Sequence, residues 1–134
     1  MSEEVTLSLD DVRRISIDVL KAGGLSSEHA QAIAGVVYAG QRDECHSHGM
    51  YRLLGCVRSV KEGKVNPNAV PEVVDHAAAV VRVDAHFGFS PLAFERGRPL
   101  LVEKARRTGL AAMAINNCFH FSALWPEVEA ISAE

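Results

Sequence analysis

The spacing of the apolar residues changes about halfway along this 134-residue chain. In the first half, three stretches repeat apolar side chains every three or four residues, which is the spacing of one face of an α-helix. In the second half, two short apolar runs flank a longer helical stretch, an order that is typical of strands joined through a helix. The pattern predicts a mixed α/β fold in which a helical bundle precedes the start of an α/β unit.

Three helices are expected in the first half, over residues 8–22, about 26–42 and about 50–62. Ser8 and the Ser26–Ser27 pair stand at N-cap positions, where a side-chain oxygen accepts a hydrogen bond from a backbone N–H group of the first turn. Glycines follow the first and third stretches, and glycine commonly ends a helix. Each helix therefore has a start signal, a stop signal or both.

The second half carries loop, strand and helix signals in turn. Residues 66–74 hold two prolines and two asparagines and are expected to form an extended loop. The short apolar runs at 77–85 and 110–116 predict strands. A helix is expected between them, from about residue 92 to 107, and Pro99 should kink or shorten it.

These elements divide the chain into two expected domains. Residues 1–75 form the helical domain, and residues 76–134 begin an α/β domain. The terminal segment SALWPEVEAISAE has the pattern of a helix without a C-terminal cap signal. We therefore expect the chain to be a fragment of a longer protein.

Composition limits the class of protein. The chain is 48% hydrophobic and 23% charged, the balance of a soluble globular protein. A net charge of −3 argues against nucleic-acid binding, which needs a basic excess. No apolar run is long enough to span a membrane. The acidic start lacks a hydrophobic signal core, and three scattered cysteines fit reduced thiols, so a cytoplasmic protein is expected.

The stretch CHSHGMYR carries the residues best suited to chemistry. On a continuous helix, His48 and Arg52 share one face, opposite a buried stripe centred on Met50, Leu54 and Val57. A guanidinium binds a carboxylate through two parallel hydrogen bonds, and an imidazole transfers protons near neutral pH. The pair is suited to a small carboxylate substrate that gains or loses a proton. A solvated helix face that happens to carry both side chains is the simpler interpretation of the pattern alone.

The residues around this pair favour an open surface over a metal centre. Gly55 and Ser59 continue the face of Arg52 and are small, so a ligand could approach closely. The cysteines and histidines do not have the spacing of a structural zinc site, and no metal is expected. Cys45 and Cys56 are expected to act as small buried hydrophobes.

A second stretch, Asn116–Ser122, lies between an expected strand and the last helix. Ser122 could cap that helix, and free N–H groups at a helix start bind phosphate. An ordinary strand-to-helix turn with Ser122 as N-cap is the simpler local interpretation. The chain has no G-x-G-x-x-G fingerprint, so a dinucleotide would have to bind through a different fold.

Four segments together resemble the malate/L-lactate dehydrogenase type-2 family of NAD(P)-dependent oxidoreductases: DECHSHGMYRL, GKVNP, VDAHFGFSPLA and INNCFHFSALWPEVE. The last segment is most similar to the Δ1-piperideine-2-carboxylate and Δ1-pyrroline-2-carboxylate reductases of that family. The resemblance extends from about residue 6 to residue 134. It implies a non-Rossmann NAD(P)-binding α/β domain, a homodimer and a much longer full-length protein. This chain would be the amino-terminal part of that protein and inactive by itself.

The resemblance also implies roles for individual residues. Ser47 and His48 fall on the relay and the proton donor, and Arg52 falls on the residue that binds the substrate carboxylate. The expected cofactor is NADPH, with NADH as the alternative, and the residues expected to contact it are His120, Phe121, Ser122, Ala123 and Leu124. In other family members the equivalent of His120 is the acid/base, so the donor role stays open between His48 and His120.

The implied reaction is reduction of a small cyclic ketimine carboxylate: Δ1-piperideine-2-carboxylate to L-pipecolate, or Δ1-pyrroline-2-carboxylate to L-proline. Hydride reaches the C=N carbon, Arg52 holds the carboxylate and His48 protonates the imine nitrogen. Two alternatives remain. One is an NAD(P)-dependent 2-hydroxy acid dehydrogenase of the malate or lactate type, and the other is a stand-alone helical interaction module without activity.

Overall fold

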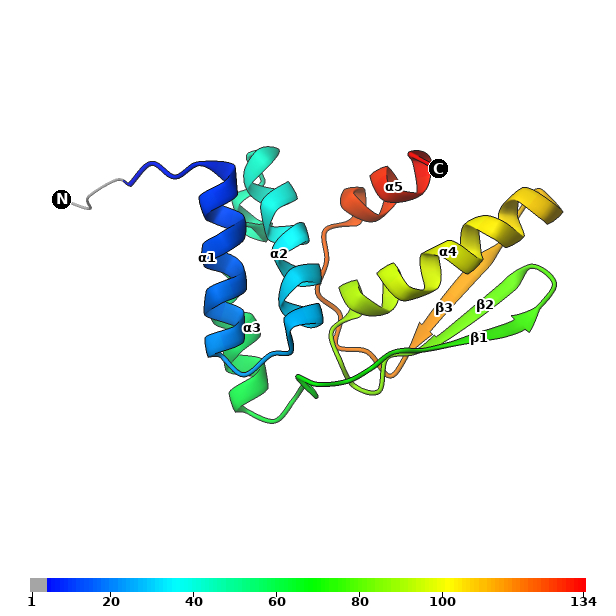
Figure 1. Ribbon diagram of the computed structural model, residues 1–134, viewed down its shortest axis with the longest axis horizontal. Helices are drawn as coiled ribbons and strands as arrows, with labels where there is room; N and C mark the ends of the chain where they lie inside the picture. Colours follow the sequence, from blue (N-terminus) through cyan, green and yellow to red (C-terminus); the bar gives the residue numbers. More distant parts are fainter. Residues whose placement is uncertain (1–4) are drawn as a thin grey trace.

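The computed structural model describes residues 5–134, and its helices and strands gather at opposite ends (Figure 1). Helices α1, α2 and α3 pack together at one end, and a sheet covered by α4 forms the other. In chain order the elements are α1 (Leu9–Ala22), α2 (Ser27–Arg42), the 3-10 turn η1 (His46–His48), α3 (Arg52–Lys61), β1 (Glu72–Ala77), β2 (Val80–Asp84), α4 (Ser90–Thr108), β3 (Ala112–Asn116) and α5 (Leu124–Ser132). The prediction of a mixed α/β fold is confirmed.

The first two helices begin at the serines that the sequence marks as caps. The Ser8 side chain accepts a hydrogen bond from the backbone N–H of Asp11 at 3.1 Å, and Ser26 accepts one from His29 at 3.3 Å. Each bond satisfies a first-turn N–H group that has no partner within its own helix. Both N-cap predictions are confirmed.

The hydrophobic core of the helical bundle takes in residues from the second half of the chain. Its buried members are Val12, Leu20, Leu25, Ala30, Ile33, Val36, Val37, Leu53, Cys56, Val65, Phe89, Phe121 and Ala123. Phe89, Phe121 and Ala123 lie well beyond residue 75, so this core crosses the boundary expected between the two domains. The division at residues 75 and 76 stays a prediction.

A three-stranded sheet has the order β1-β2-β3. Strands β1 and β2 are antiparallel, whereas β2 and β3 are parallel and pair Val83 with Ile115. Helix α4 connects the parallel strands and lies along the sheet (Figure 1). The ends of β2 and β3 therefore emerge at the same edge, and the segments that follow them stay together, as a bridge between Phe89 and Phe119 shows.

Helix α4 approaches the sheet closely at Gly97. A Cβ atom built there would lie 2.7 Å from a methyl group of Val83, closer than side chains pack, and it would also overlap the Met113 sulfur. The apolar cluster at this contact includes Val81, Val83 and Ala93. Glycine therefore lets the helix and the sheet form a separate, smaller core.

Two predictions for the second half need correction. Residues 72–77 form β1, where an extended loop followed by the start of one long strand was expected, and a turn at residues 78–79 separates β1 from β2. The helix also continues through Pro99 to Thr108 and is not shortened, while a kink at Pro99 stays a prediction. Proline has no backbone N–H group, so the carbonyl of Glu95, four residues before Pro99, has no helical partner. Both residues face solvent, so water can satisfy that carbonyl group.

A buried histidine joins the bundle to the loops that follow it. The His29 side chain is inaccessible to solvent, and its Nε2 atom lies 2.9 Å from the Ala69 carbonyl oxygen. A Cβ atom at Gly88 would lie 2.8 Å from the same ring. Burial disfavours the charged imidazolium and lowers the pKa of His29.

A buried lysine ties α4 to the edge of the sheet. The Lys104 side chain is 1% exposed, and its ammonium donates to Asp75 Oδ1 and, at 2.7 Å, to the Ala77 carbonyl. The hydrogen bond from this ammonium lowers the pKa of Asp75. Since the Asp75 side chain is 67% exposed, the carboxylate keeps most of its contact with water while the lysine does not.

Candidate functional site

Ser47 and His48 lie on the 3-10 turn η1, between α2 and α3. The Ser47 hydroxyl is 3.0 Å from His48 Nδ1, and Cys45 Sγ is 3.7 Å from the same nitrogen. When Ser47 donates this hydrogen bond, the neutral imidazole carries its proton on Nε2. The turn therefore brings together the two residues expected to form a relay and leaves Nε2 as the ring nitrogen that faces other partners.

His48 and Arg52 do not share a helix. Gly49 has an extended backbone, with φ −86° and ψ −156°, and α3 begins at Arg52. The prediction that both side chains lie on one face of a continuous helix is therefore wrong. The CHSHG stretch forms a separate turn because its end packs against α2, where a Cβ atom on Gly40 would lie 2.7 Å from the His48 carbonyl oxygen.

Arg52 lines a small cavity of about 170 Å³. The residues around this cavity, which we call the Arg52 cavity, are Tyr51, Arg52, Gly55, Cys56, Ser59, Phe89, Phe119 and Phe121. The guanidinium carbon lies 5.5 Å from the centre of the Phe121 ring, and Nε is buried without a hydrogen-bond partner among the described residues. A buried donor without a partner favours a ligand that supplies an acceptor.

Helix α3 presents its small residues to this cavity, as expected. Gly55 and Ser59 lie on the cavity wall with Arg52. The buried face is displaced from the expected stripe, because Leu53 and Cys56 are buried whereas Leu54 is 75% exposed. The expectation that Leu54 lies at the centre of the buried face is therefore wrong.

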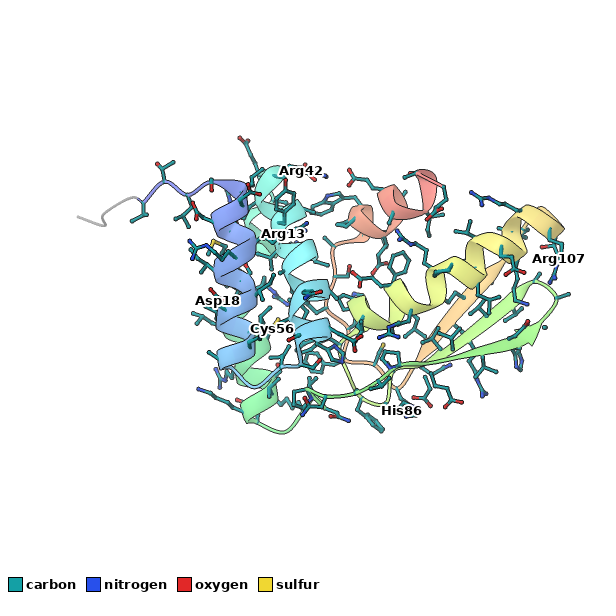
Figure 2. All side chains as sticks on the ribbon, viewed as in Figure 1. Arg13, Asp18, Arg42, Cys56, His86 and Arg107 are labelled. Carbon is teal, nitrogen blue, oxygen red and sulfur yellow. The ribbon has the colours of Figure 1, made fainter. Side chains whose placement is uncertain are left out.

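The two cysteines of this region differ in environment. Cys56 is buried within the bundle (Figure 2), and burial raises the pKa of its thiol to about 11, which fits the expected small hydrophobe. Cys45 is partly exposed, and its sulfur lies 3.5 Å from the Ser47 hydroxyl. The expectation that Cys45 is a buried hydrophobe is wrong.

The stretch expected to contact the cofactor follows β3 and faces in two directions. Phe121 and Ala123 point into the bundle core, whereas His120 is exposed and Leu124 is 77% exposed. Ser122 is half-buried and does not cap α5, which begins at Leu124 with Ala123 at the N-cap position. Instead, its hydroxyl donates to the Ala123 carbonyl at 3.0 Å.

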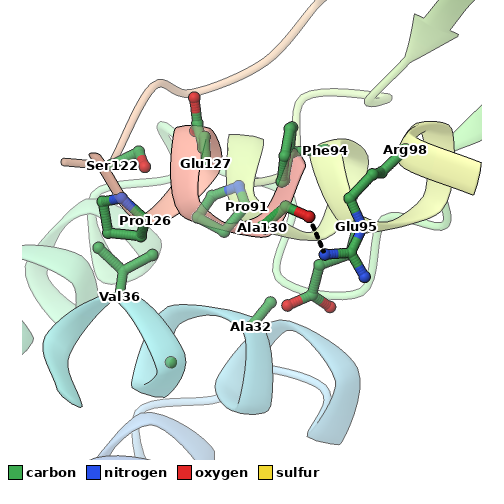
Figure 3. Close-up of a pocket in the computed structure, with 11 residues that line it drawn as sticks. Ala32, Val36, Pro91, Phe94, Glu95, Arg98, Ser122, Pro126, Glu127 and Ala130 are labelled. Atoms are coloured by element: carbon green, nitrogen blue, oxygen red, sulfur yellow. Dashed lines mark hydrogen bonds between the residues drawn. The ribbon is translucent and has the colours of Figure 1, made fainter. Parts of the chain in front are cut away.

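Ser122 lines a second cavity, of about 250 Å³, between α2, α4 and α5 (Figure 3). Glu95 and Arg98 of α4 are drawn at one side of this cavity, and Arg98 donates to the Ala130 carbonyl of α5 at 3.4 Å. Ser122 therefore borders the contact between α4 and α5 and not the Arg52 cavity, whose lining includes Phe121.

Sequence reasoning missed the aromatic wall of the Arg52 cavity. Phe89 and Phe119 lie on neighbouring extended segments with their ring centres 5.5 Å apart, and Phe121 lies 6.5 Å from Phe89. The sequence does hold part of this signal, because FHF places Phe119 and Phe121 two residues apart, on one side of an extended chain. Phe87 of FGF lies in a turn with φ 63° and is 65% exposed, so it takes no part in the wall. The sequence does not show that the segments of Phe89 and Phe119 lie side by side.

Residues 5–134 hold neither a metal-binding cluster nor a membrane-spanning helix. No group of three or more His, Cys, Asp and Glu side chains in this range is arranged to hold a metal ion. No helix of the described chain combines the length and the apolar character that a bilayer crossing requires.

Known proteins resemble this chain over nearly all of its length. A Δ1-pyrroline-2-carboxylate reductase from Burkholderia ambifaria is 63% identical over 98% of the chain, which covers 38% of that protein. A Δ1-pyrroline-2-carboxylate/Δ1-piperideine-2-carboxylate reductase from Pseudomonas aeruginosa is 52% identical over 96% of the chain and 38% of the relative. The chain thus spans about two fifths of the length of these relatives.

Solved structures agree with these relatives. The crystal structure of Δ1-piperideine-2-carboxylate reductase from Pseudomonas syringae matches 95% of this chain and 38% of its own with a TM-score of 0.91 and 41% identity. Sulfolactate dehydrogenase from Methanocaldococcus jannaschii matches 94% of this chain and 37% of its own with a TM-score of 0.84 and 25% identity. The sequence pattern of the malate/L-lactate dehydrogenase family matches residues 7–134. The chain belongs to the malate/L-lactate dehydrogenase family.

Proposed function

We propose that these 134 residues are part of a reductase of cyclic ketimine carboxylates, with Δ1-pyrroline-2-carboxylate and Δ1-piperideine-2-carboxylate as substrates and L-proline and L-pipecolate as products. The observation that carries the proposal is the buried, unpartnered Nε of Arg52 in a small aromatic cavity. It is supported by 63% identity to a Δ1-pyrroline-2-carboxylate reductase. The activity is that of a protein with the length of these relatives, which we call the full-length protein.

Arg52 binds the substrate carboxylate in this proposal. A guanidinium donates two parallel hydrogen bonds to a carboxylate, and the buried Nε of Arg52 is a donor that no described residue satisfies. The rings of Phe89, Phe119 and Phe121 offer an apolar wall for the carbon ring of the substrate. Gly55 leaves open space, since a Cβ atom there would have no described neighbour within 4 Å.

His48 donates a proton from Nε2 to the imine nitrogen, and Ser47 holds Nδ1. The 3.0 Å contact between Ser47 Oγ and His48 Nδ1 supports this division of roles. His48 does not line the Arg52 cavity among the described residues, so a substrate held by Arg52 has to reach toward the η1 turn. His120, which is exposed, is the second candidate for the proton donor.

The proposed cofactor is NADPH, with NADH as the alternative. When bound, it supplies the hydride that reduces the C=N carbon. Within residues 120–124, His120, Ser122 and Leu124 have accessible side chains. Ala123 is buried and the Phe121 ring lines the Arg52 cavity, so these two residues can offer the cofactor only backbone groups. This chain therefore fits one part of a nicotinamide site. We also propose that the full-length protein is a cytoplasmic homodimer.

A 2-hydroxy acid dehydrogenase is the second candidate, and the match to the malate/L-lactate dehydrogenase pattern favours it. A 2-keto acid carries the same carboxylate beside a C=O bond, so Arg52 could bind it equally well. The two candidates differ in whether the atom that receives the proton is the nitrogen of a C=N bond or the oxygen of a C=O bond.

Oxidation of NADPH and of NADH by the full-length protein, followed at 340 nm, tests the proposal. We expect turnover with Δ1-pyrroline-2-carboxylate and Δ1-piperideine-2-carboxylate that exceeds turnover with pyruvate and oxaloacetate. Faster reduction of the keto acids would replace the proposal with the 2-hydroxy acid dehydrogenase. No turnover with any of the four substrates would refute both.

A further inference from the structure

Trp125, the single tryptophan of the chain, packs against the proposed proton donor. The centres of the His48 and Trp125 rings lie 6.1 Å apart, and their planes are inclined by 77°. This is an edge-to-face contact, the arrangement that aromatic rings prefer. His48 thus contacts Ser47 through Nδ1 and Trp125 through its ring.

The indole ring is itself held in place by charged residues at the end of α2. Its N–H group donates to Asp43 Oδ2 at 2.7 Å. Arg42 binds Asp43 through two hydrogen bonds of 2.7 Å and reaches Glu129 of α5 at 2.9 Å. The hydrogen bond from Arg42, followed by the one from Trp125, lowers the pKa of Asp43.

This contact does more than attach α5. Helix α5 fully buries none of its residues within the described chain. It is attached through Arg98 as well as through Arg42, which Figure 2 shows at the upper end of α2. Other contacts therefore attach the helix without touching His48. Among residues 5–134, the Asp43–Trp125 hydrogen bond is the one that holds a ring against the imidazole.

We propose that Trp125 is a positioning residue for His48, and that Asp43 sets the orientation of the indole. The proposal rests on the proposed role of His48 as proton donor. A histidine on a short turn next to an extended glycine can rotate about its side-chain bonds, and Ser47 restrains one ring nitrogen only. The perpendicular indole restrains the plane of the ring, so that Nε2 keeps one direction.

Fluorescence of the 134-residue chain tests the contact without any enzymatic assay. A protonated imidazole quenches a touching indole, so we expect the emission of Trp125 to fall about twofold as the pH is lowered from about 8 to about 5. The other titratable or charged groups around the pair are Cys45, Asp43 and, through Asp43, Arg42 and Glu129. Circular dichroism at each pH establishes that the chain stays folded.

His48→Gln should remove the fluorescence transition, whereas the matched change His120→Gln should leave it. Asp43→Ala should weaken the quenching because the indole loses its tether. A transition that persists in His48→Gln, or the lack of any transition in the unaltered chain, would overturn the contact. None of these results depends on the activity of the full-length protein, so a failure here is distinct from a failure of the proposed function.

Kinetics of the full-length protein test the positioning role. Trp125→Leu should lower kcat about tenfold and leave KM for the carboxylate substrate unchanged, because misorientation of the donor affects the reaction step. Trp125→Phe should restore most of kcat, since a ring again packs against His48. Glu129→Gln is the matched control, because it breaks the other link from Arg42 to α5 and keeps the indole.

Three outcomes would overturn the role. Unchanged kcat in Trp125→Leu would show that the indole is dispensable. An equal loss in Glu129→Gln would show that attachment of α5 matters and the ring does not. A rise in KM in place of the fall in kcat would assign Trp125 to binding.

Discussion

Replacement of Arg52 by lysine separates the shape of the guanidinium from its charge. Lysine keeps the positive charge but offers a compact ammonium in place of two parallel N–H donors. Nε of Arg52 is buried without a partner in the described chain, so this donor is free to bind a ligand and takes no part in an internal hydrogen bond that holds the fold. We therefore expect Arg52→Lys to impair substrate use and to leave the fold intact.

The size of the effect follows from the hydrogen bond that lysine cannot make. A hydrogen bond to a charged group contributes about 1.5–3 kcal/mol, which corresponds to a decrease in kcat/KM of about 10- to 100-fold. Loss of the contact between the guanidinium and the Phe121 ring, 5.5 Å away, acts in the same direction. We expect the decrease to appear mainly in KM, because the carboxylate is bound before and during the reaction.

Steady-state kinetics of the full-length protein with Δ1-pyrroline-2-carboxylate measure this effect. Arg58→Lys is a matched control on the same helix, since the Arg58 side chain is 80% exposed and pairs with Glu62 at 2.7 Å. The control should change kcat/KM by less than about twofold, because exposed ion pairs contribute little. Unchanged kcat/KM in Arg52→Lys would refute the carboxylate role, and a lower melting temperature would show that Arg52 supports the fold.

Three further predictions concern catalysis and stability. His48→Ala should lower kcat by a factor of about 10²–10⁴ with little effect on NADPH affinity. A larger loss of kcat in His120→Ala would assign the role of proton donor to His120. The free energy of unfolding, measured with urea, should be constant between about pH 6.5 and about pH 8 and fall below pH 6.5, because unfolded His29 binds a proton that the buried ring resists. His29→Gln should remove this slope. Asp75→Ala should lower the free energy of unfolding more than Lys104→Met does, because it leaves a buried ammonium without its carboxylate; equal losses would contradict this.

Local signals were sufficient wherever one segment determines its own structure. Ser8 and Ser26 mark the starts of α1 and α2 because a cap needs only the side chain and the first turn of the same helix. Arg52, Gly55 and Ser59 share a cavity wall because the helical repeat alone places them there. The resemblance to a known family then assigns a chemical role to Arg52, whose position on the helix the sequence already indicates.

The sequence was insufficient where a segment depends on a distant partner. Strand β1 is exposed along almost all of its length, so it shows no apolar alternation, and an Ala-Ala turn carries no hairpin signal. It becomes a strand through its pairing with β2 and the buried Lys104, neither of which its own residues reveal. Gly49 likewise ends the η1 turn because the chain packs against Gly40, nine residues earlier.

The candidate site also depends on contacts between segments that are distant in the sequence. The four-residue spacing of His48 and Arg52 suggested one helix face, yet each side chain packs against an aromatic ring of the segment that follows β3: Trp125 for the imidazole and Phe121 for the guanidinium. That segment lies there because β3 runs parallel to β2 and continues beside Phe89. A change that disturbs the strand pairing should therefore affect both side chains together, although neither residue belongs to the sheet.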